Sequence, residues 1–158
     1  MSGAFIEGFS VRRAVLGEAT IHAEVGGSGP PLLLLHGYPQ THVAWHRIAP
    51  VLARRYTVVA PDLRGYGDSE GPPGDPLHTA HSKRTVALDQ HRLMQSLGFD
   101  RFSVIGHDRG ARVAHRLCLD HPDSVAAFVS VTVIPTTQMW ERADMAFGLG
   151  YYHWFWFA

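Results

Sequence analysis

The sequence has 158 residues, of which 46% are hydrophobic and 18% are charged. This composition supports one globular core and excludes a disordered, collagen-like or coiled-coil chain. Its 14 basic and 14 acidic side chains cancel, so there is no basic field to hold nucleic acid or an acidic membrane surface. Cys118 is the single cysteine, which excludes an internal disulfide and fits a reducing compartment.

The first nine residues lack the positive region and apolar stretch of a signal peptide. The longest aliphatic run, residues 32–35, is far too short to cross a bilayer. We therefore expect a soluble, cytoplasmic protein with neither nucleic acid nor membrane as a partner.

Along the chain, alternating polar and apolar residues first predict a β-hairpin over 9–16 and 19–25. Continuous apolar runs then predict buried strands over 31–35, 56–60, 102–106 and 125–134. Helical spacing predicts helices over 41–55, 79–97 and 109–121, and the pattern turns helical and aromatic from residue 136. Strands alternating with helices indicate an α/β fold with a largely parallel sheet, whose chemistry gathers at the carboxyl ends of the strands.

The most informative segment joins the strand 102–106 directly to the helix 109–121. Gly106 and Gly110 lie two residues before and after Asp108, which is the spacing of a nucleophile elbow. Such a turn strains its middle residue, and its flanking positions have to be small because strand and helix approach closely. A carboxylate at this position can attack a saturated carbon and form an ester that water later cleaves. The alternative is a simple turn whose aspartate caps the helix.

The chain resembles the N-terminal part of an α/β-hydrolase, specifically of the haloacetate (fluoroacetate) dehalogenase family. The stretches that carry this resemblance are residues 36–42 (HGYPQTH), 62–67 (DLRGYG), 106–112 (GHDRGAR), 135–136 with 140, and 152–154 (YHW). The turn at Asp108 alone is shared with epoxide hydrolases and haloalkane dehalogenases. The resemblance implies an α/β-hydrolase core over residues 1–135 and the start of a helical cap region over residues 136–158.

Arg109 and Arg112 lie three residues apart, so they share one face of the first helical turn beside Asp108. Guanidinium groups and a helix N-terminus both favour a carboxylate. The resemblance implies that the two arginines bind the carboxylate of a haloacetate while Asp108 attacks its α-carbon. Related enzymes that act on neutral substrates usually carry Trp after the aspartate, so Arg109 argues against them. The alternative is two surface arginines that pair with nearby carboxylates: Asp89, Asp120 or Asp123.

Two further roles follow from the resemblance. His153 and Trp154 would donate N–H groups to the departing halide, although an aromatic helix taken alone is more often core packing. The loop after the first parallel strand would lend the backbone N–H of Tyr38 to an oxyanion hole, the alternative being a tight loop without a catalytic role.

The sequence predicts neither a metal ion nor a cofactor. His42 and His46 lie four residues apart, and His78 and His81 lie three apart, but no third ligand with metal spacing accompanies either pair.

Hydrolysis of the ester needs a histidine base and an acid that orients it. The resemblance places the histidine after the final strands, where this chain has none, and the acid at the position of Thr132. We therefore expect a truncated chain that performs the first step once at most. The alternatives are a non-catalytic fragment that retains an anion pocket, and an epoxide hydrolase-like enzyme.

The expected substrate is a short 2-halo carboxylate. A truncated sheet would leave the strand 125–134 as an apolar edge, so we also expect association with a second copy or with a complementing C-terminal half.

Overall fold

The structure is a computed structural model that describes residues 3–152. One six-stranded sheet has the order β1-β2-β4-β3-β5-β6. Its strands are β1 (Ser10–Leu16), β2 (Ala19–Gly26), β3 (Pro31–Leu35), β4 (Thr57–Pro61), β5 (Phe102–His107) and β6 (Val125–Val131). The hairpin β1–β2 is antiparallel and pairs antiparallel with β4, whereas β4, β3, β5 and β6 run parallel. The predicted α/β fold with a largely parallel sheet is confirmed.

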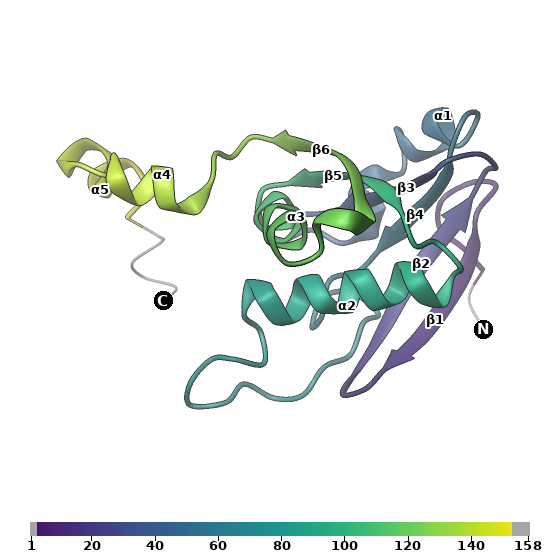
Figure 1. The fold of residues 1–158 in the computed structure, drawn as a ribbon, viewed down its shortest axis with the longest axis horizontal. Coiled ribbons are helices and arrows are strands. Elements are labelled where there is room, and N and C mark those ends of the chain that lie inside the picture. Colours follow the sequence, from purple (N-terminus) through teal and green to yellow (C-terminus); the bar gives the residue numbers. More distant parts are fainter. Residues whose placement is uncertain (1–2, 153–158) are drawn as a thin grey trace.

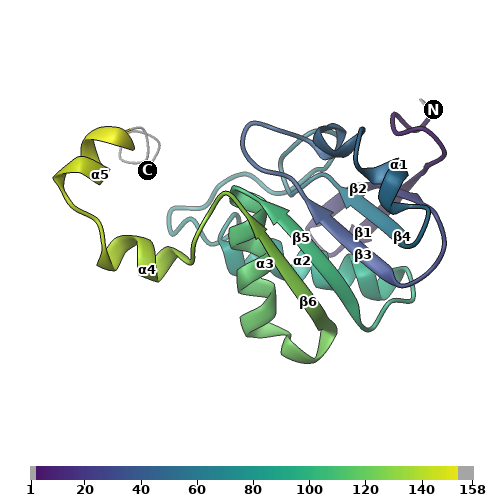
Figure 2. The ribbon, with the colours of Figure 1, turned by 90° about the horizontal axis from the view of Figure 1, so that it is seen from above.

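Helices cover both faces of the sheet (Figures 1 and 2). One face packs against α2 (Lys83–Ser96) and α3 (Arg109–Asp120) through a core that includes Leu33, Val59, Leu93 and Leu117. The other face packs against the 3₁₀ helix η1 (His42–Trp45) and α1 (Ala49–Leu52). Strands β3 and β4 are almost entirely buried because apolar side chains are covered on both sides.

The predicted helix over 41–55 is wrong. In its place the chain forms η1 and then α1 as two separate short helices. Pro50 lies at the start of α1, where a missing N–H costs nothing, but proline cannot continue a helix from the preceding turn. The predicted helix over 79–97 begins later, at Lys83, after Ser82 caps it by accepting from the N–H of Thr85. Gly98, with φ of 85°, ends this helix as expected.

Strand β6 forms the edge of the sheet and ends at Val131, three residues before the predicted end. Thr132 adopts a positive φ of 71°, and the hydroxyl of Ser130 donates to the carbonyl of Val133 at 2.6 Å. A left-handed residue cannot continue an extended strand, so the chain turns here. Most of β6 is exposed.

Beyond β6, the short helices α4 (Thr136–Glu141) and α5 (Met145–Gly150) project away from the sheet (Figures 1 and 2). Across residues 3–152, no helix combines the length and the apolar character needed to span a bilayer.

Candidate active site

Asp108 occupies a sharp turn between β5 and α3. Its backbone has φ of 50° and ψ of −116°, a conformation that a residue with a side chain adopts only under constraint. The carbonyl of Asp108 accepts from the N–H groups of Ala111 and Arg112, and its own N–H donates to the carbonyl of Val131. The side chain makes no capping hydrogen bond to the helix, so capping does not explain the aspartate.

The two glycines that flank this turn are sterically required. A Cβ on Gly106 would lie 2.5 Å from the Cα of Ala111, and a Cβ on Gly110 would lie 2.3 Å from the carbonyl oxygen of Leu35. Both contacts involve backbone atoms of packed elements, which have no room to yield. The close approach expected from the glycine spacing is therefore present.

The loop after β3 reaches the same carboxylate. The backbone N–H of Tyr38 donates to Oδ1 of Asp108 at 2.9 Å. A Cβ on Gly37 would lie 2.6 Å from the Cβ of Asp108, so this loop also has to be glycine where it passes the turn. The backbone N–H of Tyr38 is the group predicted for an oxyanion hole, and in the structure it donates to the carboxylate of Asp108.

Buried polar groups hold this loop in place. His36 is fully buried, with its Nδ1 on the carbonyl of Gly37 at 2.9 Å and its Nε2 accepting from the N–H of Leu63 at 3.0 Å. Burial lowers the pKa of His36, so the ring stays neutral and bridges two loops. The side-chain carbonyl of Gln40 accepts from the N–H of Gly37 at 3.1 Å and lies 3.0 Å from Nδ1 of His107, next to Asp108. Sequence reasoning missed the role of Gln40, because its partner beside the turn, His107, is 67 residues away.

Arg109 and Lys83 line a pocket of about 350 Å³ beside the turn. The guanidinium of Arg109 lies over the ring of Tyr38, 4.9 Å from its centroid. Lys83, at the start of α2, is partly buried, and this burial lowers its pKa. The charges of Arg109 and Arg112 lower the pKa of Lys83 further, and Asp108 opposes them. Lys83 is the only lysine in the sequence, and it was not predicted as a site residue.

Arg112 lines a second pocket, of about 170 Å³, with residues from β6 and α4. Its guanidinium donates to the hydroxyl of Thr136 at 3.3 Å and approaches the sulfur of Met139 at 3.7 Å. Burial lowers the pKa of Arg112; the negative charge of Asp108 counteracts this and the positive charge of Arg109 adds to it. The two predicted carboxylate-binding arginines therefore extend into different pockets.

The carboxylates considered as alternative partners are occupied elsewhere. Asp89 pairs with Arg64 at 2.7 Å inside the core, and Asp120 pairs with Arg116 and Arg84. Two of the three carboxylates considered as surface partners of Arg109 and Arg112 therefore pair with other arginines.

Thr132 lies directly after β6, next to the carbonyl of Val131 that accepts from the N–H of Asp108. Its hydroxyl cannot balance the charge of an imidazolium as a carboxylate would. His153 and Trp154, the predicted halide donors, lie outside the described residues.

The family model for the alpha/beta hydrolase fold matches residues 30–156. The chain is 52% identical over 149 residues to a fluoroacetate dehalogenase from Burkholderia sp, covering 94% of this chain and 49% of that protein. It is 43% identical over 123 residues to a soluble epoxide hydrolase from Corynebacterium sp. (strain C12), covering 78% of this chain and 41% of that one.

Among solved structures, the chain superimposes with a TM-score of 0.91 and 53% identity on one described as an alpha/beta hydrolase from Nostoc sp PCC 7120. The match covers 94% of this chain and 51% of that chain. The present chain thus spans about half the length of the proteins it matches.

Proposed function

The chain belongs to the α/β-hydrolase fold family, and we propose that it carries the nucleophile and the anion-binding groups of a haloacetate dehalogenase. The observation that carries this proposal is the setting of Asp108. Its carboxylate stands on a strained strand–helix turn, accepts from the N–H of Tyr38, and has the cations Arg109, Arg112 and Lys83 around it.

In the first half-reaction, the two oxygens of Asp108 have different roles. Oδ1 is held by the N–H of Tyr38, so Oδ2 is the oxygen that attacks. An electron pair from Oδ2 forms a C–O bond to the α-carbon of the haloacetate, and the halide leaves with the electron pair of the C–X bond. The product is an ester of Asp108. Cations beside the turn bind the substrate carboxylate and so hold the α-carbon in line.

In the second half-reaction, water attacks the ester carbonyl and negative charge develops on Oδ1. The N–H of Tyr38 already points at this oxygen and stabilises the charge without reorganisation. The resemblance implies that a late histidine, which these 158 residues do not include, would activate the water, and that its orienting acid would stand at the position of Thr132. We propose that the 158 residues supply the groups of the first half-reaction, with His153 and Trp154 as donors to the halide.

The epoxide hydrolase relatives favour a second candidate function, hydrolysis of a neutral epoxide through the same aspartyl ester. Three cations around Asp108 argue against it, because guanidinium and ammonium groups bind the carboxylate of a haloacetate and find no such group on a neutral epoxide. Thr132 favours a third candidate, a site that binds small carboxylates without turnover.

Intact-mass spectrometry of the chain separates these candidates. Incubation with fluoroacetate is expected to add one carboxymethyl group, and Arg109→Ala and Arg112→Ala are each expected to slow this addition at least about tenfold. Arg12→Ala, on the exposed face of β1, is the matched control and should react like the unaltered chain. Adduct formation with a neutral epoxide that is insensitive to Arg112→Ala would support epoxide hydrolysis instead. Acetate binding without any adduct would support the non-catalytic site.

A further inference from the structure

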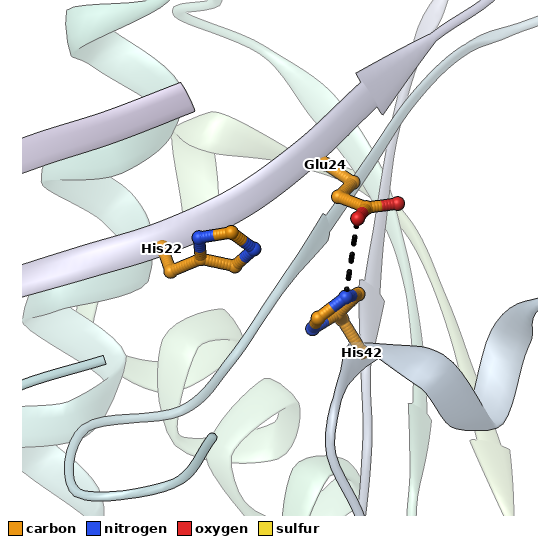
Figure 3. A group of neighbouring side chains, drawn as sticks. All are labelled: His22, Glu24 and His42. Carbon is orange, nitrogen blue, oxygen red and sulfur yellow. Dashed lines mark ion pairs between the residues drawn. The ribbon is translucent and has the colours of Figure 1, made fainter. Parts of the chain in front are cut away.

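A second group of ionisable side chains lies inside the protein. His22 and Glu24 are two residues apart on β2, so they point to the same face of the sheet, the face that η1 and α1 cover. His42 begins η1 and faces both of them (Figure 3). The exposed fractions are 6% for His22, 2% for Glu24 and 6% for His42. Groups of this kind are rarely buried without a partner that balances them.

The orientation of His42 is fixed from one side. Its Nδ1 lies 2.8 Å from Oδ1 of Asp62, which is fully buried. A carboxylate only accepts, so Nδ1 carries the hydrogen and Nε2 is the ring nitrogen that faces Glu24. Metal-binding histidines are commonly held in this way, with one nitrogen on a carboxylate and the other on the ion.

The other side of the ring faces Glu24 in an ion pair that lacks an aligned hydrogen bond (Figure 3). Nε2 of His42 is buried and has no hydrogen-bond partner among the described residues, although Oε1 of Glu24 lies 3.3 Å away. A separation of about 3.3 Å is the edge that two ligands form around a tetrahedral Zn²⁺ with bonds of about 2.0–2.1 Å. The pair therefore has the spacing of two ligands that share an ion.

His22 supplies the third donor. Ligand atoms of His22, Glu24 and His42 all lie within 4.8 Å of one another, and the rings of the two histidines are 5.0 Å apart between centroids. The carboxylate of Glu24 is in turn held by the backbone N–H groups of Phe5 and Ile6, the second of them at 2.7 Å. Two imidazoles and one supported carboxylate are a ligand set that suits zinc.

We propose that His22, Glu24 and His42 bind a divalent transition-metal ion of the zinc type, with Asp62 orienting His42 from outside the ligand set. The site joins the N-terminal segment, β2, η1 and the residue after β4, so an ion bound there stabilises the fold. The spacing of histidines along the sequence does not predict this site. It pairs His42 with His46 on one helix, whereas the three proposed ligands come from β2 and η1.

The test titrates the metal-free chain with Zn²⁺ by calorimetry and follows thermal unfolding with and without Zn²⁺. The expected result is one saturable equivalent of Zn²⁺ that raises Tm, since a ligand of the native state stabilises it. Co²⁺ should give the visible absorption of a tetrahedral site, and Mg²⁺ should not compete.

His22→Gln is the decisive variant because the hydrogen bonds that tie this residue to the fold are made by its backbone: its N–H donates to the hydroxyl oxygen of Ser69, and its carbonyl accepts from the N–H of Asp62. It should weaken Zn²⁺ binding at least about tenfold, as should Glu24→Gln. His46→Gln is the matched control: His46 is exposed in the same segment and should bind like the unaltered chain. No stoichiometric Zn²⁺ binding, or binding that His22→Gln leaves unchanged, would overturn the proposal. Far-UV circular dichroism of each metal-free variant separates loss of ligand from loss of fold.

Discussion

The backbone N–H of Tyr38 donates to Oδ1 of Asp108 at 2.9 Å, across 70 residues of sequence. This bond brings the loop after β3 onto the turn after β5. It requires glycine at position 37, because a Cβ there would lie 2.6 Å from the Cβ of Asp108 and 2.8 Å from Oδ1. The bond and the glycine together hold Oδ1 in place, so Oδ2 is the oxygen that we propose attacks the substrate.

Gly37→Ala is expected to slow the formation of the fluoroacetate adduct roughly 100-fold, because it moves Tyr38 or Asp108 out of position. Single-turnover mass spectrometry gives the rate. The matched control is Gly74→Ala, whose added Cβ would meet nothing within 4 Å, and which should react like the unaltered chain. Equal rates for the two variants would show that the contact between loop and turn has no part in the reaction.

The buried pair Arg64–Asp89 should contribute strongly to stability. Its two hydrogen bonds, at 2.7 and 2.8 Å, join the loop after β4 to α2, and both side chains are at most 5% exposed. Asp89→Asn leaves Arg64 charged and without its counter-ion in the core, so we expect a loss of about 3–5 kcal/mol in the free energy of unfolding. Urea unfolding followed by circular dichroism measures it.

The exposed pair Arg13–Glu70, at 2.9 Å, is the control for this measurement. Glu70→Gln should cost no more than about 1 kcal/mol, because solvent screens the pair. If Asp89→Asn costs as little as Glu70→Gln, the pair inside the core is not a structural element.

Lys83 should titrate below the ordinary range of a lysine, because burial and the charges of Arg109 and Arg112 lower its pKa. Below the pKa of Lys83 in the folded chain, the side chain is charged in both states, and the folded state bears the full free-energy cost of that charge. As the pH rises from that pKa to the unfolded value, the folded chain binds fewer protons than the unfolded chain, so stability increases. With one lysine in the sequence, NMR of lysine-labelled protein should give a single titrating side chain.

Lys83→Met keeps the aliphatic stem and removes the charge, so it should remove the alkaline gain in stability. Arg84→Met, at the exposed next position of α2, should retain it. An ordinary lysine pKa, or the same alkaline gain in Lys83→Met, would contradict the position assigned to this side chain beside the arginines.

The exposed edge β6 should make the 158-residue chain associate with itself. Val129 is 51% and Val131 37% exposed on this edge, where an extended apolar strand offers unpaired backbone groups. Sedimentation velocity should show concentration-dependent association that Val129→Lys reduces. Leu77→Lys, in an exposed loop, should leave it unchanged. A monomer at all concentrations would show that the edge is already protected.

Local patterns were sufficient for the strands and for the turn at Asp108. The continuous apolar runs fix β3 and β4, and the spacing of Gly106 and Gly110 reflects a steric need that local sequence can express. The prediction of one helix over 41–55 is wrong because it rests on the apolar spacing alone. Pro50 is a local signal for a new helix start, and it indicates two separate helices.

The remaining features depend on contacts between segments far apart in the sequence. Gln40 meets His107 only after β3 and β5 pair, and Lys83 approaches Arg109 only after α2 packs on α3. His22 and His42 come together because β2 pairs with β4 and His42 binds Asp62, the residue after β4. Such partners leave no periodic signal in one sequence, so the sequence predicts the turn, Asp108 and the adjacent arginines but not Gln40, Lys83 or the buried histidines.

Peptide mapping of the chain after incubation with fluoroacetate tests the nucleophile most directly. We predict one carboxymethyl group on the peptide that contains Asp108, and none in Asp108→Asn, which should remain folded because the turn depends on backbone and glycine contacts. An adduct on Cys118 or on another carboxylate, or an adduct that persists in Asp108→Asn, would contradict the assignment of Asp108 as the group that displaces the halide.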